Sequence, residues 1–320
     1  MVPLRAGHAR AVPRAAAAIV AALACAAVTS VAAPERADAR MELGVYQDSP
    51  VTGVPRLART VGGHGTKVIS VYVTAGRPLD PAIVRLARTR RARLMVSWMP
   101  DAGRDGSKGA RHRLRAVSAG RHDRSLRALV RQIRGLRPAP ILRPMPEPNT
   151  PWYAWSGTTK GNSAKAYVKA FRHVRGVTRR SGGRVRVLWA PYVRSVPEAP
   201  GNAIADYFPG AAHVDLVGVS GYNFGKKGGL AWADPEPLFA DAYREITALS
   251  PKRFWIAETG STGRGGDKAA WIQALGRLRP AMPLLAGVVW YDVRDRNGDF
   301  RIRQSGKTSR AFRALARTAS

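Results

Sequence analysis

Two glutamates are candidates for chemistry, because each lies at the end of a short apolar run. Glu147 closes the run that begins at Ile141, and Glu258 follows Phe254–Trp255–Ile256–Ala257. If both runs are strands of an α/β barrel, the two carboxyl groups project at the rim where barrel enzymes hold their catalytic residues. Two carboxyl groups facing each other across a cleft are the minimum needed to cleave a glycosidic bond. The pair therefore predicts a glycoside hydrolase.

The strands and helices that position this pair can be predicted from the apolar runs and helical patterns that alternate after residue 40. Short runs rich in Val, Ile and aromatic residues predict buried parallel strands at 41–47, 67–73, 93–99, 141–147, 185–192, 214–223, 254–260 and 285–292. Helices are expected at 81–91, 123–136, 163–180, 237–249, 267–278 and 309–318. Only short or irregular helical pieces are expected between the first and second strands and between the fifth and sixth. This α/β alternation predicts a (β/α)8 TIM barrel, as a single domain over 40–320.

The alternative architecture is an open, doubly wound sheet. That fold usually places a Gly-rich phosphate loop after its first strand, but Asp48–Ser49–Pro50 follows the first strand here. The barrel is therefore preferred. The Gly-, Arg- and Lys-rich stretch 101–122 is expected to form a long loop over the active face.

Residues 1–39 are expected to be a secretory signal peptide. Arg5, Arg10 and Arg14 precede a run rich in Ala and Val, and residues 37–39 offer the small-x-small pattern of a cleavage site. Cys25, the one cysteine of the sequence, lies in this segment, so cleavage would leave no thiol for disulfides, metal binding or nucleophilic attack. We expect a secreted monomer, free or associated with the cell wall, with no transmembrane segment in its mature form.

The formal net charge is +32, and residues 1–39 carry four Arg, one Glu and one Asp, so about +30 remains after them. Such a field favours non-specific adsorption to anionic polymers such as those of a cell wall. No nucleic-acid motif accompanies it, so no specific nucleic-acid partner is expected. The histidines lack zinc-ligand spacing, and Asp295–Asp299 predicts a turn rather than a calcium loop. We expect no metal and no cofactor.

Strand alternation also predicts what surrounds the carboxyl pair. If Glu147 points to the barrel axis, Met145 and Arg143 do so too, and Arg143 would help to keep Glu258 ionised. The same count places Ile256 and Phe254 inward beneath Glu258. It also places Ser220 beneath Tyr222.

Aromatic residues cluster at the expected strand ends. Sugar rings present apolar C–H faces that pack on aromatic faces, so a saccharide cleft tends to be walled by such side chains. Trp255 and Trp271 are assigned to the core. The aromatic residues expected to contact substrate are Trp98, Trp152, Tyr153, Trp155, Trp189 and Trp290.

The segment from Arg143 to Trp155, Arg-Pro-Met-Pro-Glu-Pro-Asn-Thr-Pro-Trp-Tyr-Ala-Trp, resembles the acid/base motif of glycoside hydrolase family 26. The stretches 207–222 and 256–260 resemble its sixth-strand and nucleophile regions, and the resemblance runs from about Leu43 to Arg301. It implies a (β/α)8 barrel that hydrolyses β-linked polysaccharide internally with retention of configuration. Most often the polymer is β-1,4-mannan, and some members act on β-glucan or xylan.

The resemblance also implies residue roles. Glu147 would be the general acid/base and Glu258 the nucleophile, with Tyr222 orienting the nucleophile. Arg143 is expected to help orient it as well, from its place on the inner face of the strand. Asn149, in the same motif, is expected to bind substrate.

One position departs from the family pattern, because Pro146 stands where the family has His before the acid/base. Since that His helps to bind the reacting sugar, the departure puts mannan in doubt as the substrate. The alternative function is a non-catalytic wall- or glycan-binding protein on a hydrolase scaffold. A binding module, however, needs neither Glu147 nor Glu258.

Overall fold

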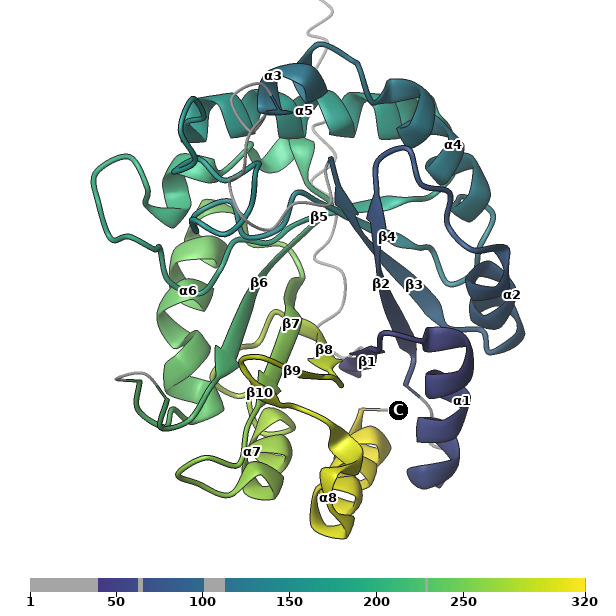
Figure 1. Cartoon of the computed structure of the whole chain (residues 1–320), viewed down its shortest axis with the longest axis vertical. Helices are drawn as coiled ribbons and strands as arrows, with labels where there is room; N and C mark the ends of the chain where they lie inside the picture. The colour runs from purple at the N-terminus through teal and green to yellow at the C-terminus, as the bar shows by residue number, and fades with distance from the viewer. Residues whose placement is uncertain (1–39, 63–65, 101–112, 228–229, 320) are drawn as a thin grey trace, which may run out of the picture. The chain divides into compact units, whose positions relative to one another are not determined.

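The computed structural model describes residues 40–62, 66–100, 113–227 and 230–319. In these ranges eight parallel strands form a closed barrel in the order β1 to β8, and β8 pairs with β1. Helices surround the barrel (Figure 1). The predicted (β/α)8 barrel is therefore confirmed, whereas the predicted signal peptide at 1–39 lies outside the described residues.

The barrel strands are β1 (Glu42–Tyr46), β2 (Val68–Thr74), β3 (Arg93–Met99), β4 (Ile141–Pro144), β5 (Arg186–Trp189), β6 (Leu216–Asn223), β7 (Phe254–Ser261) and β8 (Leu285–Tyr291). The helices are α1 (Pro50–Thr60), α2 (Pro81–Thr89), α3 (Arg113–Ser118), α4 (Asp123–Ile133), α5 (Ala164–Arg180), α6 (Pro235–Leu249), α7 (Lys268–Leu275) and α8 (Gly306–Thr318). A hairpin follows β8, formed by β9 (Arg294–Asp295) and β10 (Gly298–Asp299), so the turn expected there is present.

The barrel interior changes from apolar to polar along the strands. Near their amino ends it holds a buried cluster that includes Met95, Ile141 and Trp255. A Cβ at Gly287 would lie 2.3 Å from the Trp255 ring, so glycine is required for this indole to fill the barrel. Alternate residues of β2 share the inner face of the barrel. On this face Val68 is followed by buried Ser70 and then by Tyr72, which lines the pocket at the carboxyl end of the strand. The polar groups therefore gather at the rim where the pocket opens.

Of the two connections expected to be irregular, one differs from expectation. A regular helix, α1, joins β1 to β2 where only irregular pieces were expected. Gly53 and Pro55 weaken its local signal, but burial of Val54 and Leu57 against the barrel stabilises it. Between β5 and β6 the expected short pieces are present, as 3₁₀ turns at Ile204–Tyr207 and Ala211–His213.

The long loop expected at 101–122 is only partly described. Residues 101–112 lie outside the described ranges, and residues 113–118 form α3 instead of loop. Leu114 and Val117 of α3 are buried, which explains why this part of the stretch is helical.

No helix within the described ranges combines the length and apolar character needed to span a lipid bilayer.

Candidate active site

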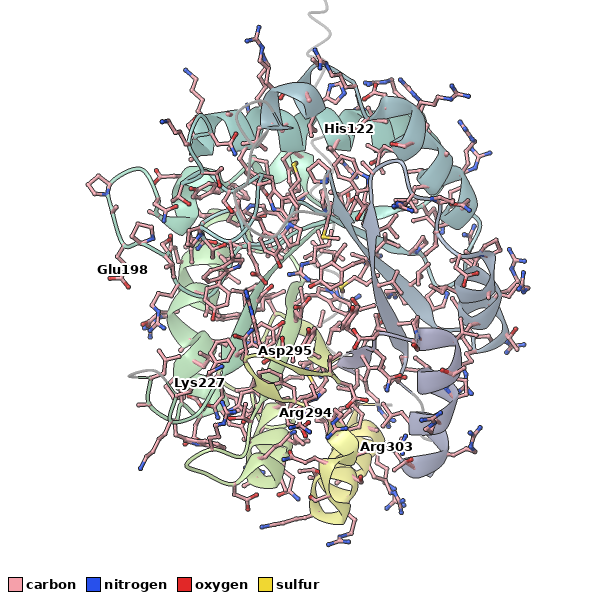
Figure 2. The ribbon with its side chains drawn as sticks, in the orientation of Figure 1. His122, Glu198, Lys227, Arg294, Asp295 and Arg303 are labelled. Atoms are coloured by element: carbon pink, nitrogen blue, oxygen red, sulfur yellow. The ribbon has the colours of Figure 1, made fainter. Side chains whose placement is uncertain are left out.

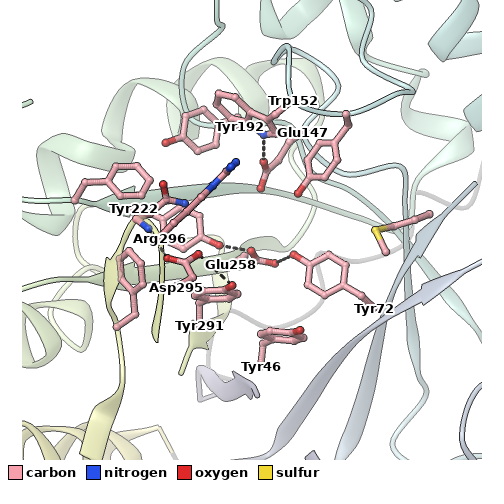
Figure 3. A pocket seen from close by; sticks show the side chains of 15 residues that line it. Tyr46, Tyr72, Glu147, Trp152, Tyr192, Tyr222, Glu258, Tyr291, Asp295 and Arg296 are labelled. Carbon is pink, nitrogen blue, oxygen red and sulfur yellow. Dashed lines mark hydrogen bonds between the residues drawn. The ribbon is translucent and has the colours of Figure 1, made fainter. Parts of the chain in front are cut away.

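A pocket of about 400 Å³ opens at the carboxyl ends of the barrel strands, and both Glu147 and Glu258 line it (Figure 3). Its walls are mainly aromatic. The lining residues are Tyr46, Tyr72, Met99, Glu147, Trp152, Tyr153, Tyr192, Tyr222, Phe224, Glu258, Tyr291, Asp295, Arg296, Asn297 and Phe300. The structure therefore brings the two predicted carboxyl groups to one cavity.

Glu258 is 3% exposed and accepts hydrogen bonds from three side chains. The Tyr222 hydroxyl donates to Oε1, and the Tyr72 hydroxyl donates to Oε2. Arg143 Nη1 also donates to Oε2, at 2.9 Å. Three donors from β2, β4 and β6 thus hold this carboxylate in one orientation, which is what a nucleophile needs.

A bulge in β7 turns Glu258 toward the axis. Val219 pairs with Ile256, but Ser220 pairs with Glu258, so Ala257 is an extra residue in this strand. The expectation that Ile256 and Phe254 point inward is wrong, because the bulge breaks the alternation on which it rested. Both side chains lie in the outer core, while Trp255 and Ala257 fill the barrel.

Glu147 does not lie on a strand, since β4 ends at Pro144. Met145 and Glu147 have φ values of 48° and 55°, in the left-handed region that non-glycine residues rarely adopt. Because the backbone reverses here, the prediction that Arg143, Met145 and Glu147 all point to the barrel axis is wrong for Met145. Arg143 points into the barrel and Glu147 into the pocket, but Met145 packs in the outer core.

Buried hydrogen bonds hold this strained segment. The amide of Met145 donates to Trp98 O at 2.9 Å, and that of Glu147 donates to Ala190 O at 3.0 Å. Trp155 Nε1 donates to Pro146 O at 2.8 Å. Left-handed conformations of this kind cost about 1–3 kcal/mol each and persist where the surroundings impose them, often at functional sites.

Arg143 joins the two carboxyl groups from below. Its guanidinium is fully buried; Nη1 lies 2.9 Å from Glu258 Oε2, and Nη2 lies 3.6 Å from Glu147 Oε1. The same group donates to the hydroxyls of Ser97 and Ser220. As expected, Ser220 lies on the inner face below Tyr222. One buried cation therefore neutralises part of a doubly acidic site.

The surroundings of Glu147 favour its protonated form. Burial, and then the negative charge of Glu258, raise the pKa of the Glu147 carboxyl. Arg143 opposes this shift, as does the hydrogen bond of 2.9 Å from Trp152 Nε1 to Glu147 Oε2. A carboxyl group with a raised pKa beside a carboxylate that accepts from three donors is the arrangement that distinguishes a general acid from a nucleophile.

Of the predicted substrate-binding residues, Trp152 and Tyr153 line the pocket. Trp152 meets the Tyr192 ring edge-on, at a centroid distance of 5.3 Å. Asn149 is fully buried, so its expected contact with substrate is not available to its side chain. Instead it accepts from Tyr192 N at 2.8 Å and donates to Tyr192 O at 3.0 Å, which fixes a residue of the pocket wall.

Four tryptophans expected in the cleft lie in the core, namely Trp98, Trp155, Trp189 and Trp290. Trp98 points away from the axis because its neighbour Ser97 points inward. Trp290 packs on Trp271 and donates to Phe300 O at 2.7 Å. Trp155 lies beneath Tyr153, with ring centroids 4.4 Å apart. Trp155 and Trp290 thus contact pocket residues from behind, and none of the four lines the pocket. Trp255 and Trp271 are buried as expected.

Several pocket residues were not anticipated, above all Tyr46, Tyr72 and Tyr291. The Tyr46 ring stacks on Tyr291 at 5.2 Å and meets Tyr72 edge-on at 5.1 Å. All three lie near the ends of expected strands, so counting by two from the barrel interior could have found Tyr72. The hairpin residues Asp295–Asn297 gave no such signal, since their position depends on how the chain folds back after β8.

Within the described ranges, no group of three or more His, Cys, Asp or Glu side chains is arranged to hold a metal ion. The chemistry that the pocket can perform with its own groups is proton transfer and nucleophilic attack by carboxyl groups.

No protein-family model matches the chain. It is 30% identical over 177 residues, 54% of its length, to endoglucanase H of Acetivibrio thermocellus. It is 28% identical over 146 residues, 44% of its length, to the mannan endo-1,4-beta-mannosidase of Bacillus subtilis. These matches span only 19% and 36% of the two relatives.

Among solved structures, the catalytic domain of the GH26 endo-beta-1,4-mannanase of Bacillus sp. JAMB-750 is similar with a TM-score of 0.62. This likeness covers 85% of each chain at 13% sequence identity. The chain therefore has the fold of the family 26 mannanases.

Proposed function

We propose that this chain is a retaining endo-glycosidase that hydrolyses a β-linked polysaccharide by double displacement. The observation that carries the proposal is that Arg143 contacts both Glu147 and Glu258 at the base of one aromatic-walled pocket. The fold and the sequence similarity to an endoglucanase and a mannanase support the same class of reaction.

In the first step, protonated Glu147 gives its proton to the leaving glycosidic oxygen while Glu258 attacks the anomeric carbon. This forms a glycosyl ester on Glu258 and releases the first sugar product. In the second step, Glu147 takes a proton from water, which attacks the ester and frees Glu258. Tyr72, Tyr222 and Arg143 hold the attacking carboxylate, so little reorganisation is needed before bond formation.

The pocket wall supports a sugar polymer as substrate. Tyr46, Tyr153, Tyr192 and Tyr291 offer aromatic surface together with hydroxyl groups, a combination suited to the apolar faces and hydroxyls of pyranose rings. We propose a β-1,4-linked backbone, either mannan or glucan. Pro146 stands where the family pattern has a His that helps to bind the reacting sugar, so the choice between the two backbones is tested directly below.

The direct test is release of reducing sugar by residues 40–320 from mannan, mixed-linkage glucan, xylan and acidic wall polysaccharides. Glu258→Ala and Glu147→Ala should each abolish release, because each removes one of the two reacting carboxyl groups. Glu198→Ala, which removes an exposed carboxyl group that does not line the pocket, is the matched control. Proton NMR of the first product should show retained anomeric configuration.

Failure of this test has a defined meaning. If the folded protein binds one of these polymers without hydrolysing any of them, and Glu258→Gln binds equally well, the chain is a glycan-binding module. An inverted first product would overturn the double displacement but not the hydrolase.

We also propose that the enzyme acts outside the cell, on the basis of the signal-like pattern at 1–39, and that it is a monomer. The amino-terminal sequence of protein recovered from culture medium tests this, with cleavage after Ala39 expected. Retention of residues 1–39 in the active protein would contradict it. Light scattering of residues 40–320 tests the monomer.

A further inference from the structure

The β9–β10 hairpin places a guanidinium group at the mouth of the pocket. Arg296, at the hairpin turn, lines the pocket that holds Glu147 and Glu258. Figure 3 shows its side chain extended over the cleft toward the side where Glu147 lies. Within the described part of the chain this guanidinium makes no hydrogen bond or ion pair, so its donors are available to a ligand.

The hairpin turn that carries Arg296 is held in place. Lys227 Nζ donates to the carbonyl oxygens of Arg296 and Asn297, at 2.8 and 3.0 Å. Arg264 donates to the Asn297 carbonyl oxygen at 3.2 Å. Figure 2 shows Lys227 beside the hairpin, to the left of Asp295 and Arg294. The anchoring groups are themselves cations, so they add positive potential around Arg296.

The acidic groups of the pocket are engaged elsewhere. Glu258 accepts from Tyr72, Tyr222 and Arg143, and Glu147 accepts from Trp152. The remaining carboxylate, Asp295, accepts from the amides of Asn297 and Gly298 at 2.8 and 3.2 Å. The Tyr291 hydroxyl lies 3.4 Å from its other oxygen. Asp295 thus shapes the turn, and none of the three is paired with Arg296.

We propose that Arg296 binds a carboxylate of the substrate, so that the polymer cleaved here is acidic, with uronic acid units next to the bond that is broken. This inference rests on the proposed glycosidase function and names its substrate class. The planar guanidinium fork matches a carboxylate in a way that it does not match a single sugar hydroxyl. The net charge, about +30 without residues 1–39, would also concentrate an anionic polymer at the protein surface.

The test compares sugars that differ only in charge. The probes are β-1,4-linked manno- and gluco-hexasaccharides and their C6-oxidised forms, the corresponding uronates. The parent chain should cleave one of the uronates with kcat/KM about tenfold above that of its neutral counterpart, the scale of one charge-assisted hydrogen bond. In Arg296→Gln this ratio should fall to about one, mainly through loss of activity on the uronate.

Arg294→Gln is the matched control, because it removes an exposed positive charge from the same hairpin but does not line the pocket. It should keep the preference for the uronate. If Arg294→Gln lowers the preference as much as Arg296→Gln does, the effect is one of general charge and the proposed contact is wrong.

The other outcomes are equally defined. Cleavage of the neutral sugars alone, or of both forms at equal rates by the parent, overturns the acidic substrate and leaves the glycosidase standing. Cleavage of none of the four also overturns this inference, and the broader polysaccharide panel then decides the glycosidase separately.

Discussion

The hydroxyl of Tyr72 donates a hydrogen bond to Oε2 of Glu258, although the two residues are 186 positions apart in sequence. The same oxygen accepts from Arg143, so β2 and β4 both act on one atom of a β7 side chain. Tyr72 is partly buried and lines the pocket. Desolvation, together with the negative charge of Glu258, raises the pKa of its phenol. The raised pKa favours the protonated phenol, which is the form that donates this hydrogen bond.

Tyr72→Phe should lower kcat/KM by about tenfold to a hundredfold, because a hydrogen bond to a charged group contributes about 1.5–3 kcal/mol. The ring and its packing on Tyr46 remain, so the melting temperature should change little. Steady-state kinetics and thermal unfolding of the same preparation measure the two effects. Unchanged kinetics would show that Tyr72 does not position the carboxylate.

The pH dependence of activity should be set by the protonation of the Glu147 carboxyl group. As a general acid it must carry a proton, so activity should fall as pH rises through its pKa in the folded protein, which burial raises above the ordinary value of about 4.3. Trp152→Phe removes a hydrogen bond that favours the charged form. The pKa should then rise further, and the basic limb of the kcat/KM profile should move to higher pH. A shift to lower pH would contradict this assignment.

Arg143→Met should destabilise the protein by about 3–5 kcal/mol and abolish activity, because it leaves a buried acidic pair without its cation. Combined with Glu258→Gln, the loss of stability should be smaller than the sum of the two single effects. Urea unfolding of the two single variants and the double variant measures this coupling. Additive free energies of unfolding would mean that the guanidinium and Glu258 do not interact.

Trp290→Ala should act on stability and not on substrate choice. The indole is buried between β8 and the helices, packs on Trp271 and Phe312, and does not line the pocket. A large-to-small change of this kind costs about 3–5 kcal/mol. The preference among polysaccharides should be unchanged at a temperature where the variant is folded. A changed preference with unaltered stability would return Trp290 to the substrate-binding residues.

The barrel could be predicted from sequence because its signals are local. Short Val- and Ile-rich runs alternating with amphipathic stretches indicate parallel strands and covering helices. The rim position of the two glutamates then follows from the fold, since parallel strands of one barrel end on one face. The pairing of Arg143 with Glu258 could be anticipated in the same way, from strand alternation and the need of a buried cation for a carboxylate.

The orientation of individual side chains could not be predicted as well. One extra residue in β7 reverses the faces of Ile256 and Phe254, and two left-handed residues after Pro144 do the same for Met145. A shift of one position exchanges the two faces of a strand. Each of these side chains was therefore predicted inside the barrel but lies in the outer core. The tryptophans were misplaced for a related reason: position near a strand end does not say which face a residue occupies.

The sequence by itself thus determined the barrel, the carboxyl pair and the cation beside it, since these depend on residue type and periodicity. The tertiary structure alone decided where β7 bulges, how the Glu147 loop reverses and where the β9–β10 hairpin places Arg296. Each of these depends on contacts between distant segments, such as Glu147 N with Ala190 O and Lys227 with the hairpin carbonyls. Such contacts form only when the barrel closes, so no local pattern in the sequence contains them.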